Sequence, residues 1–339
     1  MNKRNNAFIL ALYMFLSSCL TGCKNNNSEE IYEVENITVP TYIEETLDEI
    51  PSTTEFVIIE PEETTIPTEI TEPEETTIPT EIVEPTYEEE FVKKEIVLTL
   101  DEIAFLTIGG KYGYGETRRQ NIINLGYDYD VISKRVDELL AGASYSIPDR
   151  NTYNFNFGYV KDKVDVYDIN GNREGSLSAY QKFLISDQHI DGMTLVYFKD
   201  QTFYLKDKHI NRIADSHIEL DISDQKVYFY LDGVLILEAD VITGNPNKGT
   251  TPGTNLGITE VLRFSYNVTF DGGKESEIFI LFNWDGEGFH DAGWRIDSEF
   301  DDKERYLNHG SNGCCNMKDE DVTILEENTY MGMPVLIHK

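Results

Sequence analysis

Two adjacent cysteines, Cys314 and Cys315, follow a glycine in a 339-residue chain that contains only two other cysteines. A thiol becomes a strong nucleophile when a nearby imidazole or converging backbone N–H groups lower its pKa. His290, 24 residues upstream of Cys314, is the candidate base. Gly313 allows a tight turn that could aim amides at a developing oxyanion, and Ser311 is placed to orient the imidazole or a substrate carbonyl. These residues predict acyl transfer; the alternative is a buried pair of inert thiols beside a surface histidine.

The order of the candidate residues separates classes of cysteine enzyme. Papain-like enzymes place the nucleophile before the histidine, whereas here the only histidine after the pair is His338. Sortases run His, Cys, Arg, and no arginine follows Cys315. His290 followed by Ser-x-Gly-Cys resembles the YkuD-type L,D-transpeptidases instead.

Three motifs carry this resemblance, which covers roughly residues 217–339. They are Thr243 and Gly244 with Thr251, Pro252, Gly253 and Thr254; then Gly288, Phe289, His290, Asp291, Trp294 and Arg295; then Ser311, Asn312, Gly313, Cys314, Cys315, Asn316 and Met317. The resemblance implies that Cys314, directly after the glycine, is the nucleophile and His290 the base. Among neighbouring residues it implies substrate-binding roles for Asp291, Trp294, Arg295, Asn312 and Asn316. His309 lies close by, but the resemblance gives the role of base to His290.

The fold class that follows is multidomain, with a mostly β catalytic domain over 215–339. The resemblance implies that the Cys314 thiolate attacks the carbonyl of the third residue of a tetrapeptide stem and expels the terminal D-Ala. The acyl group then passes to the side-chain amine of a second stem as a 3-3 crosslink, without a metal or organic cofactor.

Two alternatives to this function stay open. Many family members have His where this chain has Asn312, so the protein could be a wall-binding lipoprotein whose transpeptidase fold is catalytically inactive. Water or a D-amino acid could also replace the acceptor amine, which would give an L,D-carboxypeptidase or an exchange enzyme.

Strand patterns surround the candidate site. Residues 217–240 alternate between apolar and polar, and Asp232-Gly233 predicts a hairpin turn. A helix from about Asp319 and a final strand close the chain. Because consecutive side chains of an extended segment face opposite ways, we expect Cys315 to point inward as a small packed hydrophobe when Cys314 faces the cleft.

Residues 158–212 alternate as short strands, with turns predicted at 168–172, 189–192 and 198–201. Their order is similar to a bacterial SH3-like domain. Such domains often contact wall peptides, although aromatic residues in small barrels also serve as core.

Residues 96–142 show three short helical patterns, with Asp101 and Asp128 as candidate N-caps. The stretch resembles the Cpl-seven-type cell-wall-binding repeat. The residues that fill its pattern are Glu102, Ile103, Ala104, Gly110, Lys111, Tyr112, Gly113, Gly115, Arg118, Gly126, Tyr127, Asp128, Tyr129, Arg135, Val136, Leu139 and Leu140. Tyr112 stands where the pattern has Trp. The resemblance implies muropeptide binding, for which we select Lys111, Tyr112, Arg118, Tyr127 and Asp128; a spacer that has lost its ligand is the alternative.

The first 95 residues read as an export signal and a tether. Residues 1–22 combine a basic start with a short apolar run, and the following Cys23 completes a sequence that resembles a bacterial lipobox, which implies lipidation. Residues 23–95 contain a 12-residue Glu/Pro/Thr repeat, predicted to be disordered.

Charge is concentrated in this tether. Of the formal net charge of -34, residues 24–95 contribute 22 acidic residues against 3 basic ones. A nucleic-acid partner is not expected, since it would require clustered Lys and Arg. The expected partners are peptidoglycan stem peptides and the membrane, which the lipid would contact. We expect a monomer on the outer side of the cell membrane, facing the cell wall.

Overall fold

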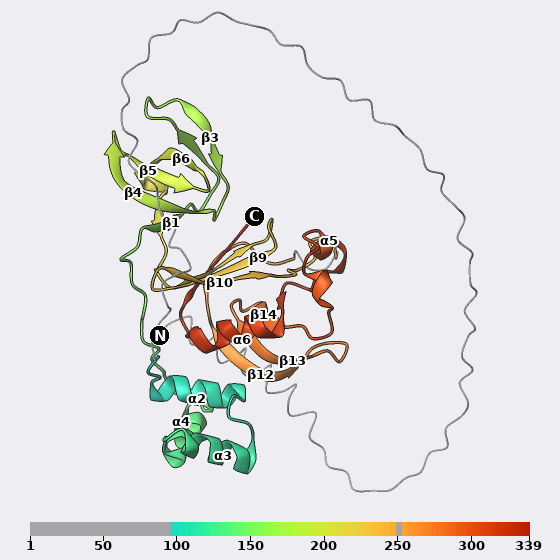
Figure 1. Cartoon of the computed structure of the whole chain (residues 1–339). Helices are drawn as coiled ribbons and strands as arrows, with labels where there is room; N and C mark the ends of the chain where they lie inside the picture. The colour runs from blue at the N-terminus through green and yellow to red at the C-terminus, as the bar shows by residue number, and fades with distance from the viewer. Residues whose placement is uncertain (1–95, 249–252) are drawn as a thin grey trace, which may run out of the picture. The chain divides into compact units, whose positions relative to one another are not determined.

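The computed structural model describes residues 96–248 and 253–339 of the chain. The predicted signal peptide, Cys23 and the tether therefore lie outside the described residues. The described part begins with helices and continues in strands, which form three sheets (Figure 1).

Three helices occupy the stretch for which three were predicted: α2 (Leu100–Gly109), α3 (Gly115–Asn124) and α4 (Tyr129–Leu140). Asp128 caps α4, as predicted, because its carboxylate accepts hydrogen bonds from the N–H groups of Asp130 and Val131 at 2.9 and 3.2 Å. Within the described ranges, no helix combines the length and the apolar character needed to cross a membrane.

The predicted cap of α2 was wrong. Thr99 begins this helix: its hydroxyl accepts from the N–H of Glu102 at 3.3 Å, and the Glu102 carboxylate accepts from the N–H of Thr99 at 2.8 Å. This reciprocal capping box satisfies the N–H groups of both Thr99 and Glu102 at the start of the helix. Asp101 instead accepts a hydrogen bond from Arg135 of α4 at 2.6 Å and so joins two helices.

The next region is a seven-stranded sheet in the order β3-β2-β6-β5-β4-β1-β7. Its strands are β1 (Phe157–Tyr159), β2 (Val164–Tyr167), β3 (Arg173–Leu177), β4 (Lys182–Ile190), β5 (Met193–Phe198), β6 (Gln201–Lys206) and β7 (Asn211–Arg212). All of the strand pairs are antiparallel, and the three predicted turns join β2 to β3, β4 to β5 and β5 to β6.

The C-terminal domain has two sheets, of which the first has five strands in the order β10-β9-β8-β16-β11. These are β8 (His217–Asp221), β9 (Lys226–Leu231), β10 (Val234–Asp240), β11 (Gly257–Glu260) and β16 (Pro334–His338). The predicted Asp232-Gly233 turn joins β9 to β10, and both residues have the positive φ that such a turn requires. The final strand, β16, lies parallel to β8 and antiparallel to β11, in the interior of the sheet.

The second sheet of the C-terminal domain has the order β12-β13-β14-β15. Its strands are β12 (Arg263–Thr269), β13 (Glu275–Leu281), β14 (Gly288–Asp291) and β15 (Cys315–Met317). Helix α6 (Asp319–Asn328), predicted from about Asp319, packs between the two sheets through the buried Val322 and Leu325 (Figure 1). This two-sheet frame holds both candidate reactive residues, because β14 carries His290 and β15 follows Cys314.

Helix α2 packs directly on strand β12. A methyl group added at Gly109 would lie 2.2 Å from the carbonyl oxygen of Phe264, so only glycine permits this approach. Just beyond the helix, Lys111 Nζ lies 2.5 Å from the carboxylate of Glu326 in α6. The same carboxylate also accepts a hydrogen bond from the hydroxyl of Tyr266. The helical region and the C-terminal domain therefore share a packed, charged contact.

Candidate active site

The register of β14 and β15 brings His290 and Cys314 to one face of the second sheet. The two strands are parallel, with Phe289 beside Cys315 and His290 beside Asn316. Because side chains alternate along a strand, the residue before Cys315 projects on the same face as His290. Both side chains also lie near one apolar cluster of Val268, Phe279 and Leu281: the His290 ring lies 6.2 Å from that of Phe279, and Cys314 packs against the cluster.

The Cys314 thiol is half-buried and is held by backbone groups of the preceding hairpin. Its Sγ donates to the carbonyl of Gly286 at 3.5 Å and accepts a hydrogen bond from the N–H of Gly288. Burial raises the pKa of the thiol to about 11; the Gly288 N–H opposes this shift, and the Glu287 carboxylate adds to it. The resting nucleophile is therefore a neutral thiol.

His290 is buried and is fixed through one ring nitrogen. Nδ1 lies 2.7 Å from the backbone carbonyl of Asp291, and since a carbonyl can only accept, Nδ1 carries the proton. Nε2 is then the unprotonated nitrogen, which is the form a general base needs. Burial lowers the pKa of His290 to about 4; the Asp291 carbonyl and carboxylate oppose this shift, while Arg295 and Lys274 add to it.

A short hydrogen-bonded turn precedes the nucleophile. The Ser311 hydroxyl donates to the carbonyl of Cys314 at 2.6 Å and accepts from the N–H of Gly313 at 3.0 Å. The Thr254 hydroxyl donates to the carbonyl of Gly313 at 2.7 Å and accepts from the N–H of Gly244 at 2.8 Å. Ser311 thus fixes the turn, and its role in orienting the imidazole or a substrate carbonyl stays a prediction.

Gly313 is required by this turn for two reasons. Its φ of 144° lies in the region that L side chains rarely adopt, and a Cβ there would come within 2.6 Å of the Glu287 carboxylate. Gly313 is buried, so the surrounding chain has little room to move away.

We expect Gly313→Ala to lower the free energy of unfolding by about 3 kcal/mol, since backbone strain and the clash with Glu287 add together. Gly272→Ala is the matched control: Gly272 also has a positive φ, of 84°, but nothing lies within 4 Å of its added Cβ. That control should cost about 1 kcal/mol, from strain alone. Urea unfolding of both variants makes the comparison, and equal losses would mean that the contact with Glu287 is not limiting.

Three of the predicted substrate-binding residues are occupied by contacts within the chain. The Asp291 carboxylate accepts from the Ser276 hydroxyl and from two N–H groups of β13. Arg295 donates to Glu299, to the carbonyl of His309 and to the side chain of Asn316. The buried Asn316 also donates to the carbonyl of Ile242. These side chains are therefore engaged in the wall of the site, and their contact with a substrate stays a prediction.

Trp294 and Asn312 remain available to a ligand. The Trp294 ring lies 5.7 Å from that of His290, and its buried Nε1–H has no hydrogen-bond partner among the described residues. Asn312 is exposed at the tip of the turn. The exposed His309 lies on the short helix α5 (Arg305–His309), outside β14, where the predicted base His290 lies.

Cys315 is fully buried, and both cysteines are free thiols. Burial raises the pKa of Cys315 above its ordinary value, and the neighbouring Cys314 adds to the effect. The structure therefore pairs a half-buried Cys314 with an inward-facing Cys315 and contains no disulfide between these neighbours.

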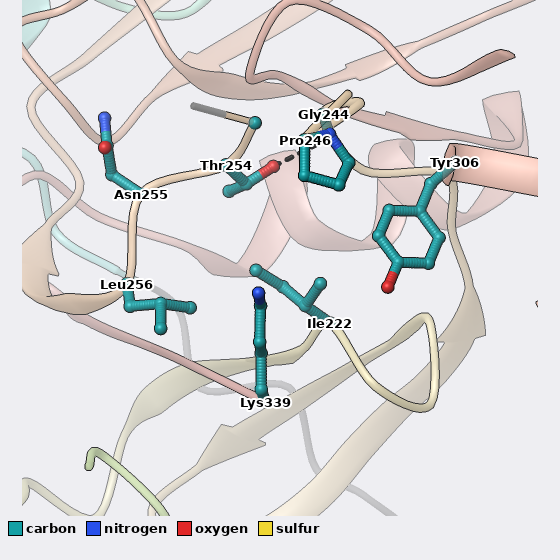
Figure 2. A pocket seen from close by; sticks show the side chains of 9 residues that line it. Ile222, Gly244, Pro246, Thr254, Asn255, Leu256, Tyr306 and Lys339 are labelled. Carbon is teal, nitrogen blue, oxygen red and sulfur yellow. Dashed lines mark hydrogen bonds between the residues drawn. The ribbon is translucent and has the colours of Figure 1, made fainter. Parts of the chain in front are cut away.

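A cavity of about 260 Å³ lies beside the nucleophile turn. Figure 2 shows Lys339 extending into it below Pro246 and Thr254, with the Tyr306 hydroxyl turned toward the same space. Its wall includes Gly244 and Thr254, which hold the turn, but neither Cys314 nor His290 lines it. The cavity is therefore separate from the reactive pair. Elsewhere in the described ranges, no group of three or more His, Cys, Asp or Glu is arranged to hold a metal ion.

The five predicted wall-binding residues are largely engaged within the protein. Lys111 pairs with Glu326, Tyr112 is buried and Asp128 caps α4. Arg118 donates to the carbonyl of Gly113 at 2.9 Å, and Tyr127 is half-buried. Tyr114, which was not selected, is 64% exposed with the Arg118 guanidinium over its ring, so an exposed aromatic side chain lies two residues after the buried Tyr112.

Comparison with known proteins agrees with two of the sequence resemblances. Residues 215–337 match the L,D-transpeptidase catalytic domain family (YkuD), and residues 101–140 match the CW_7 repeat. The C-terminal domain thus has an L,D-transpeptidase fold, as its motifs predicted. The SH3-like interpretation of residues 158–212 stays a prediction. No curated protein matched the sequence.

Solved structures similar to this chain are also L,D-transpeptidases. The NMR structure of the catalytic domain from the E. faecium L,D-transpeptidase is 29% identical over 37% of this chain and 97% of its own, with a TM-score of 0.30. An L,D-transpeptidase from Mycobacterium smegmatis is 13% identical over 58% of this chain and 88% of its own, with a TM-score of 0.31. Because these TM-scores are low, the identity of the C-terminal domain rests on the family match.

Proposed function

We propose that this protein is a peptidoglycan L,D-transpeptidase that forms 3-3 crosslinks through an acyl-enzyme on Cys314. The observation that carries the proposal is the pairing of β14 with β15 inside the matched domain, since it gives a half-buried thiol and an imidazole a common face. A thiol and a neutral imidazole are the two groups that cysteine acyl transfer requires.

The first half-reaction starts from an uncharged pair. The Cys314 thiol breaks its hydrogen bond to the carbonyl of Gly286 and turns toward Nε2 of His290. As sulfur bonds to the carbonyl carbon of the third stem residue, Nε2 takes the thiol proton. The N–H of Gly313 is already engaged by Ser311, so we expect the oxyanion at the N–H of Cys314. The imidazolium then protonates the D-Ala nitrogen, which departs and leaves a thioester.

The second half-reaction returns the enzyme to its starting state. The side-chain amine of an acceptor stem attacks the thioester carbonyl and loses a proton to His290. The C–S bond breaks, the thiolate takes that proton back, and the product is the 3-3 amide. If water attacks instead, the product is a tripeptide stem and the activity is that of an L,D-carboxypeptidase.

The remaining regions support a role at the cell wall. The match to the CW_7 repeat supports muropeptide binding by residues 96–142, and the seven-stranded sheet is the region where we place an SH3-like contact with wall peptides. Cys23 would carry the lipid that anchors the protein, as a monomer, outside the cell membrane. In this arrangement the tether would span the distance between membrane and wall.

Incubation of the purified protein with disaccharide-tetrapeptide stems tests the proposed activity. The expected result is release of D-Ala with formation of dimers whose fragmentation places the new amide between two third-position residues. Tripeptide monomers without dimers would identify a carboxypeptidase. Unchanged stems would support the alternative of an inactive wall-binding protein, for which the exposed Asn312 is the visible departure from the family.

A further inference from the structure

A buried carboxylate that the reaction does not use lies beneath the nucleophile turn. Glu287 is only 5% exposed, and its oxygens accept hydrogen bonds from the N–H of Asn255 at 3.2 and 3.3 Å, from Asn255 Nδ2 at 3.0 Å and from Asn283 Nδ2 at 3.0 Å. All of these donors belong to the chain itself, so the carboxylate is fully engaged and is not a binding site for a substrate ammonium group.

Each contact of Glu287 is made with a segment that borders Cys314. Asn255 follows Thr254, whose hydroxyl holds the carbonyl of Gly313 at 2.7 Å. Asn283 begins the hairpin loop whose Gly286 carbonyl accepts the Cys314 thiol. The third contact is direct, because the Glu287 carboxylate packs against the position where Gly313 lacks a Cβ. One side chain thus ties together the three segments that surround Cys314.

The charge of Glu287 works against the nucleophile. Burial raises the pKa of this carboxyl, Asn283 and Asn255 oppose the shift, and Asp285 adds to it. When ionised, the carboxylate also raises the pKa of the Cys314 thiol. A group kept there for its charge alone would slow the reaction, so its value must lie in the geometry that it imposes.

We propose that Glu287 is a positioning residue, whose carboxylate locks the Gly313 turn and the 283–288 loop so that Cys314 is aimed at the substrate carbonyl. This proposal rests on the proposed function. A displacement of about 1 Å at a reacting atom can cost on the order of 100-fold in rate, so loss of the lock should be visible in acylation.

Glu287→Gln tests the proposal because it keeps the shape, removes the charge and turns one acceptor into a donor that faces Asn255 or Asn283. Two rates are measured at pH 8. One is acylation of Cys314 by ertapenem, which acylates the catalytic domain of the E. faecium L,D-transpeptidase; the other is alkylation of Cys314 by iodoacetamide, which needs a thiolate but little orientation. We expect acylation to fall at least about 10-fold, while alkylation stays equal or rises because the thiol pKa falls. Glu275→Gln, which removes an exposed charge at the start of β13, should leave both rates unchanged.

Other outcomes would overturn the proposal. If acylation and alkylation both rise, Glu287 acts only through its charge. If both fall equally along with a lower thermal midpoint, it is only a structural group. Asn255→Ala removes a single side-chain donor to Glu287 and serves as a second test if Glu287→Gln misfolds. It should also slow acylation, and the effects of the two substitutions should not be additive. Failure of the wild-type protein to form an ertapenem adduct, with normal alkylation, would instead count against the proposed function.

Discussion

Cys314→Ala should form no ertapenem adduct and no 3-3 dimer, while Cys315→Val should retain both. The two thiols differ in access: Cys314 is half-buried and hydrogen-bonded at Gly286, whereas Cys315 is fully buried within β15. Only the Cys314 thiol is accessible to a substrate carbonyl. Valine is close in size to cysteine and apolar, so the second substitution preserves the packing that Cys315 provides.

Intact-mass measurement after exposure to ertapenem decides between the cysteines. One adduct is expected on the wild type and on Cys315→Val, with none on Cys314→Ala. An adduct that persists in Cys314→Ala and disappears in Cys315→Val would reverse the assignment. No adduct on any variant would favour the inactive fold.

His290→Gln should slow acylation by about 10² to 10⁴-fold, the range expected when a general base is lost. Glutamine keeps a donor that can reach the Asp291 carbonyl, but it has no nitrogen that can take a proton from the thiol. Iodoacetamide alkylation at pH 9 should be nearly unchanged, since added base then supplies the thiolate. His309→Gln is the control, because that exposed imidazole should have no effect on acylation. A rate that depends on His309 and not on His290 would move the base to α5.

The pH dependence of acylation follows from the burial of His290. Its pKa is lowered to about 4, so the imidazole stays unprotonated and able to act as a base down to about pH 5. The rate should therefore be flat between about pH 5 and 8 and fall as the pH drops through 4. Stopped-flow acylation of the wild-type protein measures this profile. A fall centred near pH 6.5, the ordinary value for histidine, would mean that the imidazole is far more solvated than in this structure.

Local chemistry made the first hairpin, helix α6 and the final strand of the C-terminal domain predictable. Asp232-Gly233 predicts its hairpin because both residues accept a positive φ, and alternation alone separates Cys314 from the buried Cys315. The sheet order was not predictable in this way. Nothing local indicates that β16 inserts beside β8, because that pairing joins segments more than a hundred residues apart.

The roles of the site residues were harder to predict than their positions. Asp291, Arg295 and Asn316 lie next to the reactive pair in sequence, but no local signal shows that their side chains form hydrogen bonds within the chain. Glu287 was missed because one acidic residue in a loop carries no periodic signal. The capping box of α2 had a visible signal, Thr99 followed three residues later by Glu102, and it outweighs the isolated Asp101.

The resting state of Cys314 also determines how the protein withstands oxidants. With a pKa of about 11, only about one thiol in ten thousand is a thiolate at pH 7. Peroxides react with the thiolate, and the products beyond the sulfenic acid are largely irreversible. A thiol that stays protonated and donates to the Gly286 carbonyl therefore reacts slowly with peroxides between turnovers. If the protein lies outside the cell membrane, as we propose, no thiol pool would repair an oxidised Cys314, and the low thiolate fraction would then prolong the protein's working lifetime.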